Sequence, residues 1–358
     1  MISPNLHSPE GPRRLEGLDI ARCIAFLGMV VVNFRVVVAP ADQTPRWIDV
    51  CVSSLEGRAA ALFVMLAGIG LGLASDRHGI GFRRTLLKRA AFLMVIGLLN
   101  SLVFPADILH YYAVYFLIGA ACIRLPAVAL WALSAGIVLL FPMLLFIFDY
   151  EKHWDWSTLS YEGFWTFDGF VRNLLYNGWH PAIPWSAFVL AGMAISRLRL
   201  DRRRTQLVLL VVSASVAAGT EFGAAALQHA VPDEYRELRD AFLTTSVIPP
   251  TPLYMIASAA TAMACVGAVL LMTPWLHRLH IARLFARTGR QTLTLYIAHI
   301  LLGMGVLDYL GKLESGDLTY AFNAAAVFCI LSIISSNIWA IRFRHGPLEW
   351  LMRRMSMT

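Results

Sequence analysis

Residues 91–121 read AFLMVIGLLNSLVFPADILHYYAVYFLIGAA and hold two apolar runs that only a short Pro-Ala-Asp segment separates. The apolar residues of each run are continuous, whereas a strand of a transmembrane barrel alternates apolar with polar residues. With its flanking residues, each run is long enough for a helix that crosses a bilayer, which takes about 20 residues. The stretch therefore predicts two consecutive membrane helices, and runs of the same kind recur along the chain.

The composition of the 358 residues agrees with this prediction and excludes a soluble fold. Hydrophobic residues make up 58% of the chain and charged residues 15%, whereas soluble domains average roughly 45–50% and about 25%. The mean hydropathy is +0.62. Because a soluble domain cannot bury that much apolar surface, we expect an all-α, polytopic integral membrane protein.

The apolar runs predict about ten membrane-spanning helices, with eleven left open. About ten helices of about 20 residues use about 200 positions and leave the remainder for short loops. The predicted spans lie near residues 18–38, 57–75, 84–104, 107–124, 126–148, 181–197, 205–227, 251–273, 288–308 and 320–341.

The distribution of Lys and Arg sets the predicted orientation. With the N-terminus in the cytoplasm, the inner segments carry 21 of these residues and the outer segments carry 8. Basic residues favour the cytoplasmic side, so both termini are predicted to be cytoplasmic. The net charge of +7 is then an orientation signal, and we expect no nucleic-acid partner. The predicted parts are a tail at 1–17, one transmembrane domain at 18–341 and a tail at 342–358, in the inner cell membrane.

Polar residues inside the predicted spans are candidates for function, because burying them in a bilayer is costly unless they are paired or hydrated. Asp19 and Arg22 are three apart on the first span and can form an ion pair on one helical face. This pair is either a structural lock or a place where Arg22 meets an anionic ligand from the cytoplasm. Glu221 lies deep in the seventh span, and Asn33 can form an interhelical hydrogen bond.

Three of the ten histidines mark a candidate site. His110 follows Asp107 by three residues, so the carboxylate can orient the imidazole and hold its tautomer, as a general base requires. His180, in NGWHPAIPW, begins another span at the same predicted outer boundary, and His299 lies about halfway through the ninth span. A lone membrane histidine is more often a packing residue, but two at one boundary favour a shared site.

Other motifs are less decisive. GIGLGL at 68–73 lies inside a span and indicates close helix packing rather than a dinucleotide loop. The aromatic residues of the outer loop 150–179 can stack on sugar rings or form an interfacial belt. The basic run 197–204 can meet CoA phosphates or anionic lipid beside its role in orientation. The five cysteines look like small apolar residues, and no metal-ligand spacing is found, so no metal is expected.

Together these motifs resemble the YeiB-like family of the transmembrane acyltransferase superfamily, which also includes heparan-alpha-glucosaminide N-acetyltransferase. RLEGLDIARCIAFLGMVVVN is similar to the family's first span, with its R-x-x-x-L-D-x-x-R pattern. ADILHYYA resembles its (G/A)-D-I-L-H-x-Y-A element, and HPAIPW its H-P-x-x-P-W element. RTGRQTLTLYIAHILL and GPLEWLMRR resemble its C-terminal block, a domain of unknown function. The resemblance covers roughly residues 13–120, 176–204 and 284–354.

The resemblance implies an enzyme that moves an acyl group, typically acetyl, from cytoplasmic acyl-CoA to an amine or hydroxyl of a saccharide-like or small-metabolite acceptor outside. On that expectation acetyl-CoA, or another acyl-CoA, is the co-substrate. The expected catalytic residues are His110, Asp107 and His180. The residues expected to bind the donor are Asp19, Arg22, Asn33, Arg89, Arg290 and His299. The residues expected to bind the acceptor are Trp179, Trp185 and Glu221. Unlike the heparan enzyme, residues 39–56 of the first predicted outer loop hold no histidine, so an acyl-histidine step is not assumed.

A different class stays open beside the enzyme. A transporter or channel for a small metabolite could use Asp19, Arg22, Glu221 and His299 as a substrate or proton path. Such a protein would carry flux with no acyl donor present, whereas an acyltransferase would bind acetyl-CoA saturably. The expected partners are membrane lipid, acyl-CoA and the acceptor, and a homodimer is left open.

Overall fold

The computed structural model describes residues 15–38, 45–75, 81–313 and 315–357, and it shows an all-α, multi-pass membrane protein. The only strands within these ranges are the antiparallel pair β1 (Trp154–Asp155) and β2 (Ser160–Tyr161). The α-helices are α1 (Glu16–Val38), α2 (Arg46–Leu55), α3 (Arg58–Ser75), α4 (Phe82–Ser101), α5 (Leu109–Cys122), α6 (Ala127–Ile147), α7 (Phe167–Arg172), α8 (Ala182–Ile195), α9 (Arg203–Ala230), α10 (Arg236–Phe242), α11 (Pro252–Arg278), α12 (Ala282–Gly289), α13 (Thr292–Ala298), α14 (Gly305–Tyr309), α15 (Leu318–Arg342) and α16 (Pro347–Met357). Two π-helical segments, η1 (Asn173–Asn177) and η3 (His299–Met304), and the 3-10 turn η2 (Asp233–Tyr235) complete the elements. Residues 1–14 of the predicted N-terminal tail lie outside the described residues.

Each of the ten predicted spans overlaps a helix, although not every such helix has the length of a span. Seven helical stretches of the described residues are long and apolar enough to cross a membrane. Two further apolar helices, α5 and α8, have 14 residues each, and the first half of α4 is basic. The all-α class is therefore confirmed, while the count of ten spans and the cytoplasmic position of both termini stay predictions.

Two segments differ from the sequence-based expectation. Residues 46–55, predicted as part of an outer loop, form α2, in which Ile48 and Val52 are buried one turn apart. So short an apolar stripe escapes a search for continuous runs of about 20 residues. The helix of the ninth span starts at Thr292 and passes from α13 through the π-helical η3 into α14, so it is not one regular helix.

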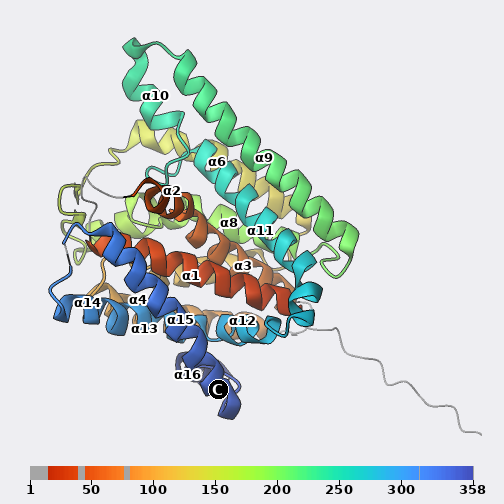
Figure 1. Cartoon of the computed structure of the whole chain (residues 1–358). Coiled ribbons are helices and arrows are strands. Elements are labelled where there is room, and N and C mark those ends of the chain that lie inside the picture. The colour runs from red at the N-terminus through yellow and green to blue at the C-terminus, as the bar shows by residue number, and fades with distance from the viewer. Residues whose placement is uncertain (1–14, 39–44, 76–80, 314, 358) are drawn as a thin grey trace, which may run out of the picture.

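The helices α1, α3 and α11 form the centre of the molecule. α1 packs against α3, α11, α12 and α15, and α3 packs against α8 and α11. Half or more of the apolar stretch in each central helix is buried, whereas α6, α9 and α15 leave most of theirs exposed. Figure 1 shows α9 along the upper right edge of the molecule. In a membrane protein, apolar helix faces exposed to this extent are those that lipid covers.

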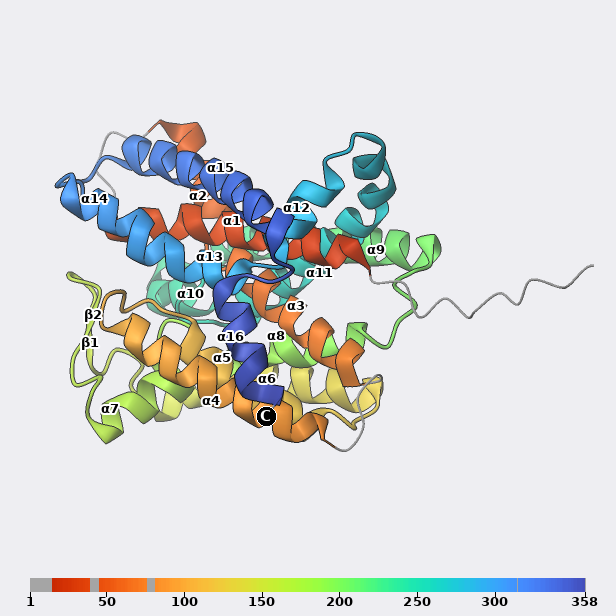
Figure 2. The same ribbon diagram turned by 90° about the horizontal axis from the view of Figure 1, so that it is seen from below.

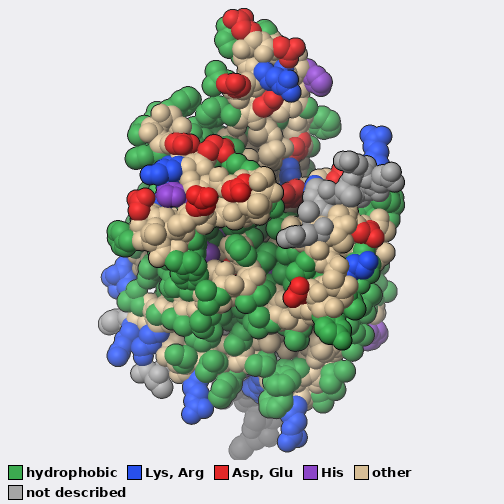
Figure 3. All heavy atoms as spheres, turned by 90° about the vertical axis from the view of Figure 1, so that its left-hand side faces the viewer, with side chains coloured by type: hydrophobic (Ala, Val, Ile, Leu, Met, Phe, Trp, Pro, Cys, Tyr) green, Lys and Arg blue, Asp and Glu red, His purple; other side chains and the backbone are tan. Residues whose placement is uncertain are grey.

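The loops predicted to lie on one side of the membrane gather at one end of the bundle. In Figures 1 and 2 the β1–β2 hairpin and α14 lie at the left, and the start of α9 lies at the right. Figure 3 looks onto the left-hand end and shows acidic side chains gathered over its upper part. The hairpin, in a predicted outer loop, and α14, at the predicted outer end of the ninth span, thus lie at the end opposite to the start of α9, which follows a predicted inner loop.

Close packing of α3 against α8 accounts for the glycines of GIGLGL. A Cβ on Gly68 would clash with the backbone carbonyl of Val189, and one on Gly192 would clash with that of Met65. The two backbones can therefore touch only where side chains are absent, as is common between membrane helices. The packing interpretation of this motif is confirmed.

We expect Gly68→Ala to destabilise the protein, because the added methyl group would meet the Val189 carbonyl. Overpacking of this kind costs about 1–3 kcal/mol. The matched control is Gly136→Ala on α6, where an added Cβ meets nothing within 4 Å. Thermal unfolding in detergent should show a lower melting temperature for Gly68→Ala alone, and equal melting temperatures would contradict the packing.

Candidate active site

A cavity of about 360 Å³ lies between α1, α3, α4, α5, α13 and α16, and arginines from four parts of the chain line it. These are Arg22, Arg89, Arg290 and Arg353. The first three are the arginines that the sequence assigned to the donor, and the fourth was missed. Two carboxylates, Asp19 and Glu349, line the same space. This inner cavity thus carries surplus positive charge, which favours an anionic ligand.

The ion pair on α1 holds one wall of the inner cavity. Arg22 Nη1 lies 2.6 Å from Asp19 Oδ1, and the carboxylate is almost completely buried. A Cβ on Gly70 of α3 would lie only 3.1 Å from Arg22 Nη2, so the glycine lets the guanidinium lie against α3. Ala67 and Ala74, on the same face of α3, are small and leave room for the cavity. The predicted ion pair is confirmed, and its arginine also faces the ligand space.

Most of the segment predicted as a C-terminal tail is a helix, α16, that lines the inner cavity. α16 packs against α4 and α13. Glu349 accepts hydrogen bonds from the Leu293 N–H at 2.7 Å and the Thr294 N–H at 3.2 Å, so it caps the first turn of α13. Burial raises the pKa of the Glu349 carboxyl, and the hydrogen bonds from Thr294 and Leu293 oppose that shift. Arg353, one turn further along α16, is thereby held in the cavity wall.

Asp107 and His110 form a fully buried pair at the start of α5. His110 Nδ1 lies 3.2 Å from Asp107 Oδ2, which also accepts from the Leu109 N–H at 2.7 Å. Asn100 Nδ2 donates to Asp107 Oδ1 at 2.7 Å. A carboxylate only accepts, so this contact places the imidazole proton on Nδ1 and leaves Nε2 as the basic atom. Nε2 has no hydrogen-bond partner among the described residues, and the predicted contact is confirmed.

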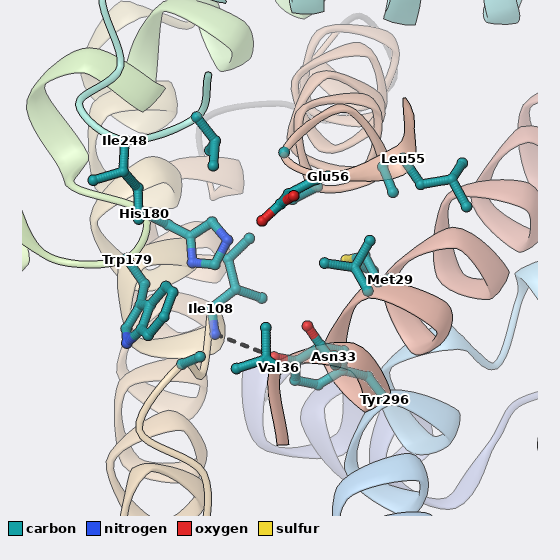
Figure 4. Close-up of a pocket in the computed structure, with 16 residues that line it drawn as sticks. Met29, Asn33, Val36, Leu55, Glu56, Ile108, Trp179, His180, Ile248 and Tyr296 are labelled. Carbon is teal, nitrogen blue, oxygen red and sulfur yellow. Dashed lines mark hydrogen bonds between the residues drawn. The ribbon is translucent and has the colours of Figure 1, made fainter. Parts of the chain in front are cut away.

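A smaller cavity, of about 60 Å³, lies between α1, the α2–α3 turn, the start of α5 and the loop before α8. Figure 4 shows the His180 ring reaching into it and the Glu56 carboxylate pointing toward that ring from the opposite side. Trp179 lies beside His180, and Asn33 of α1 lines the lower part. This outer cavity joins an imidazole, a carboxylate and an amide at an otherwise apolar wall, which suits a small polar ligand.

His180 lines the outer cavity, whereas His110 does not. The His180 ring packs edge-on against Trp185, with ring centroids 4.7 Å apart, and its Nδ1 has no partner among the described residues. The Tyr111 ring contacts both imidazoles, at 3.9 Å from His110 and 5.9 Å from His180. The structure therefore brings the two predicted histidines into one region but gives only His180 access to the cavity.

The aromatic outer loop folds over the histidines. Trp154 stacks on Trp156 at 4.3 Å and meets Trp179 edge-on at 5.3 Å. Phe164 lies edge-on to His110 at 5.8 Å. Asn177 fixes the loop, because its Nδ2 donates to the backbone carbonyls of residues 150 and 152. The rings thus form a packed cover over the candidate site.

Three predicted site residues take positions that the sequence did not anticipate. Glu221 pairs with Arg58 and lines neither the inner nor the outer cavity, so its role toward a substrate stays a prediction. Asn33, assigned to the donor, lines the outer cavity, and its Nδ2 lies 3.0 Å from His299 Nε2. Trp185 is fully buried against His180 and does not line the cavity.

In a comparison with known proteins, the chain matches two family models and one relative. Residues 14–223 match the model described as "Heparan-alpha-glucosaminide N-acetyltransferase, catalytic", and residues 197–358 match "Protein of unknown function (DUF418)". The chain is 26% identical to the uncharacterised protein YeiB of Escherichia coli (strain K12), over 95% of each chain. Arg22 and Arg89 come from the first matched region, and Arg290 and Arg353 from the second, so both regions build the inner cavity.

We expect Glu349→Ala to loosen α16 and the first turn of α13, because it removes the acceptor for the Leu293 and Thr294 N–H groups. Loss of a helix cap costs about 0.5–2 kcal/mol. Hydrogen exchange of residues 292–298 should speed up, while Glu234→Ala, at an exposed acid of η2, should leave it unchanged. Unchanged exchange in Glu349→Ala would show that α13 does not depend on this cap.

Proposed function

The chain belongs to the YeiB-like family, which is related to heparan-alpha-glucosaminide N-acetyltransferase, and from this premise we propose that it is a transmembrane acyl-CoA-dependent acetyltransferase. The donor is acyl-CoA, with acetyl-CoA first, entering from the cytoplasm. The acceptor is an amine or hydroxyl of a saccharide-like molecule or small metabolite on the outer side of the inner membrane.

The inner cavity is the observation that carries this proposal. CoA bears several phosphate charges, and arginine binds phosphate with two parallel hydrogen bonds, which makes it the preferred residue for such groups. Arg22, Arg89, Arg290 and Arg353 converge on one space beside the predicted inner surface. The same space extends along apolar faces of α3 and α5 toward the outer cavity, and these faces suit the long pantetheine arm.

The transfer itself is a displacement at the thioester. The acceptor nitrogen or oxygen forms a bond to the thioester carbonyl carbon, and the carbon–sulfur bond breaks. The acceptor proton passes to a neutral imidazole, which then returns it to the departing CoA thiolate. The reaction consumes one acyl-CoA and one acceptor, and yields acylated acceptor and CoA thiol.

Two imidazoles are available for that proton, and their surroundings differ. His180 lines the outer cavity, so it is placed to hold the acceptor together with Trp179. His110 has the orientation of a base, because Asp107 binds its Nδ1 and leaves Nε2 unpaired. His110 is fully buried and lines neither cavity, so this role requires the packing around it to open when substrate binds. We assign the proton transfer to His110 and the positioning of the acceptor to His180.

We expect Arg22→Ala, Arg89→Ala and Arg290→Ala each to weaken acetyl-CoA binding by at least about 10-fold, since a hydrogen bond to a charged group contributes about 1.5–3 kcal/mol. Titration calorimetry of the purified protein in lipid nanodiscs measures this without any acceptor. Arg203→Ala is the matched control, because Arg203 is exposed at the start of α9 and lines neither cavity. Failure of the wild-type protein to bind acetyl-CoA would contradict the proposed function.

We expect His110→Ala to lower kcat by about 10²- to 10⁴-fold while acetyl-CoA still binds, as is usual when a positioned base is lost. His180→Ala should mainly raise the KM for the acceptor. Acetyl transfer is followed by mass spectrometry, with glucosamine as the probe acceptor and with membrane extracts as a second source. A kcat loss in His180→Ala together with normal turnover in His110→Ala would reverse the two assignments.

A further inference from the structure

Tyr296 has a position that the proposed function leaves unexplained. Of the residues that the structure describes, it alone lines both the inner and the outer cavity. On α3, Ala60 lines the outer cavity, and Phe63, three residues further on, lines the inner cavity. At the start of α5, Ile108 lines the outer cavity and the next residue, Leu109, lines the inner cavity. The two cavities therefore meet end to end at one level of the bundle, and the Tyr296 side chain lies at that level.

Ile108 and His299 contact Tyr296 directly, and Asn33 supports His299. The residue is 2% exposed, and its hydroxyl accepts a hydrogen bond from the Ile108 N–H at 3.2 Å, the dashed line in Figure 4. His299 packs edge-on against the ring at 4.8 Å and bonds through Nδ1 to the Tyr296 carbonyl. His299 Nε2 in turn contacts Asn33 of α1 at 3.0 Å. His299 thus packs directly against Tyr296 and Asn33 supports His299, although the sequence assigned both to the donor.

We propose that Tyr296 is the barrier between the two cavities and that its ring limits the length of the acyl group that is transferred. The barrier follows from the two cavities alone, whereas the limit on acyl length rests on the proposed function. In a direct transfer the thioester carbon meets the acceptor where the cavities join. A fixed ring at that point would limit how far an acyl chain can extend beyond the thioester carbon, so acetyl is the donor group that we expect the ring to favour.

This role also assigns a part in the reaction to residues 197–358, which match the family model of unknown function. Tyr296 lies in the part of the chain that matches that family model, whereas His110 and His180 lie in the part that matches the catalytic model. The second region therefore supplies the specificity-determining residue for chemistry carried out by the first.

The barrier is tested by accessibility, without any assay of activity. Ala67 lines the inner cavity, and Ala67→Cys provides a thiol there. A membrane-impermeant methanethiosulfonate reagent, added to sealed vesicles on the side where His180 lies, should label this thiol slowly. With Tyr296→Ala added, labelling should be at least about 10-fold faster, because thiol reactivity follows access. Protein without Ala67→Cys measures the background from the native cysteines.

Two further variants keep this test decisive. Tyr296→Phe keeps the ring and removes the hydroxyl, so the barrier should stay closed, whereas Tyr296→Leu should open it with a smaller loss of packing. Gel filtration and thermal unfolding confirm that each variant is folded. Labelling rates that do not differ between the wild-type, Leu and Ala side chains at position 296 would overturn the barrier.

The limit on acyl length is tested with acetyl-, butyryl- and hexanoyl-CoA, by release of CoA thiol in the presence of glucosamine. Tyr296→Ala should raise the ratio of hexanoyl to acetyl kcat/KM by about 10-fold or more, since even one methylene in a pocket changes discrimination by about 10-fold. Tyr296→Phe should keep the wild-type ratio. The same ratio in Tyr296→Ala would overturn the limit on length. No release from any donor by the wild-type protein would overturn the proposed function instead, and the labelling would still decide the barrier.

Discussion

The ion pair between the buried Asp19 carboxylate and the partly buried Arg22 is the interaction around which the inner cavity is built. A lone arginine in a bilayer is costly, and pairing it with a carboxylate one turn away lets α1 carry a cation within a predicted span. Neighbouring helices approach α1 closely at these residues. A Cβ on Gly289 of α12 would clash with the backbone carbonyl of Asp19, and Gly70 of α3 leaves room for the Arg22 guanidinium. Close packing of α12 and α3 thus surrounds the pair, and Arg22 presents a positive charge to the inner cavity.

The two regions that match separate family models together line both cavities. The first supplies Arg22, Arg89, the Asp107–His110 pair and His180, and the second supplies the wall opposite them. In that wall Glu349 of α16 caps α13, and α13 carries Tyr296 to the level where the cavities meet. A change in α16 can therefore act on Tyr296 through α13, although α16 lies far from the histidines in sequence.

Sequence reasoning succeeded where the signal is local. Continuous apolar runs predicted the helices, and the spacing of Asp19 to Arg22 and of Asp107 to His110 predicted pairs that the structure contains. It failed where distant elements meet. Nothing near Glu221 indicates that Arg58 neutralises it, because the two residues are 163 positions apart. Arg353, Glu56 and Tyr296 likewise enter the cavities only through the packing of α16, the α2–α3 turn and α13. The depth of His110 behind Tyr111 is also a result of packing and not of spacing.

In the proposed function a CoA donor occupies the inner cavity and reaches toward the outer one. A cryo-electron microscopy structure of the protein in nanodiscs with saturating CoA measures this directly. We expect density for the phosphates beside Arg22, Arg89 and Arg290, and for the sulfur end beside Tyr296. CoA density at another surface, or an inner cavity that stays empty at saturating CoA, would contradict it.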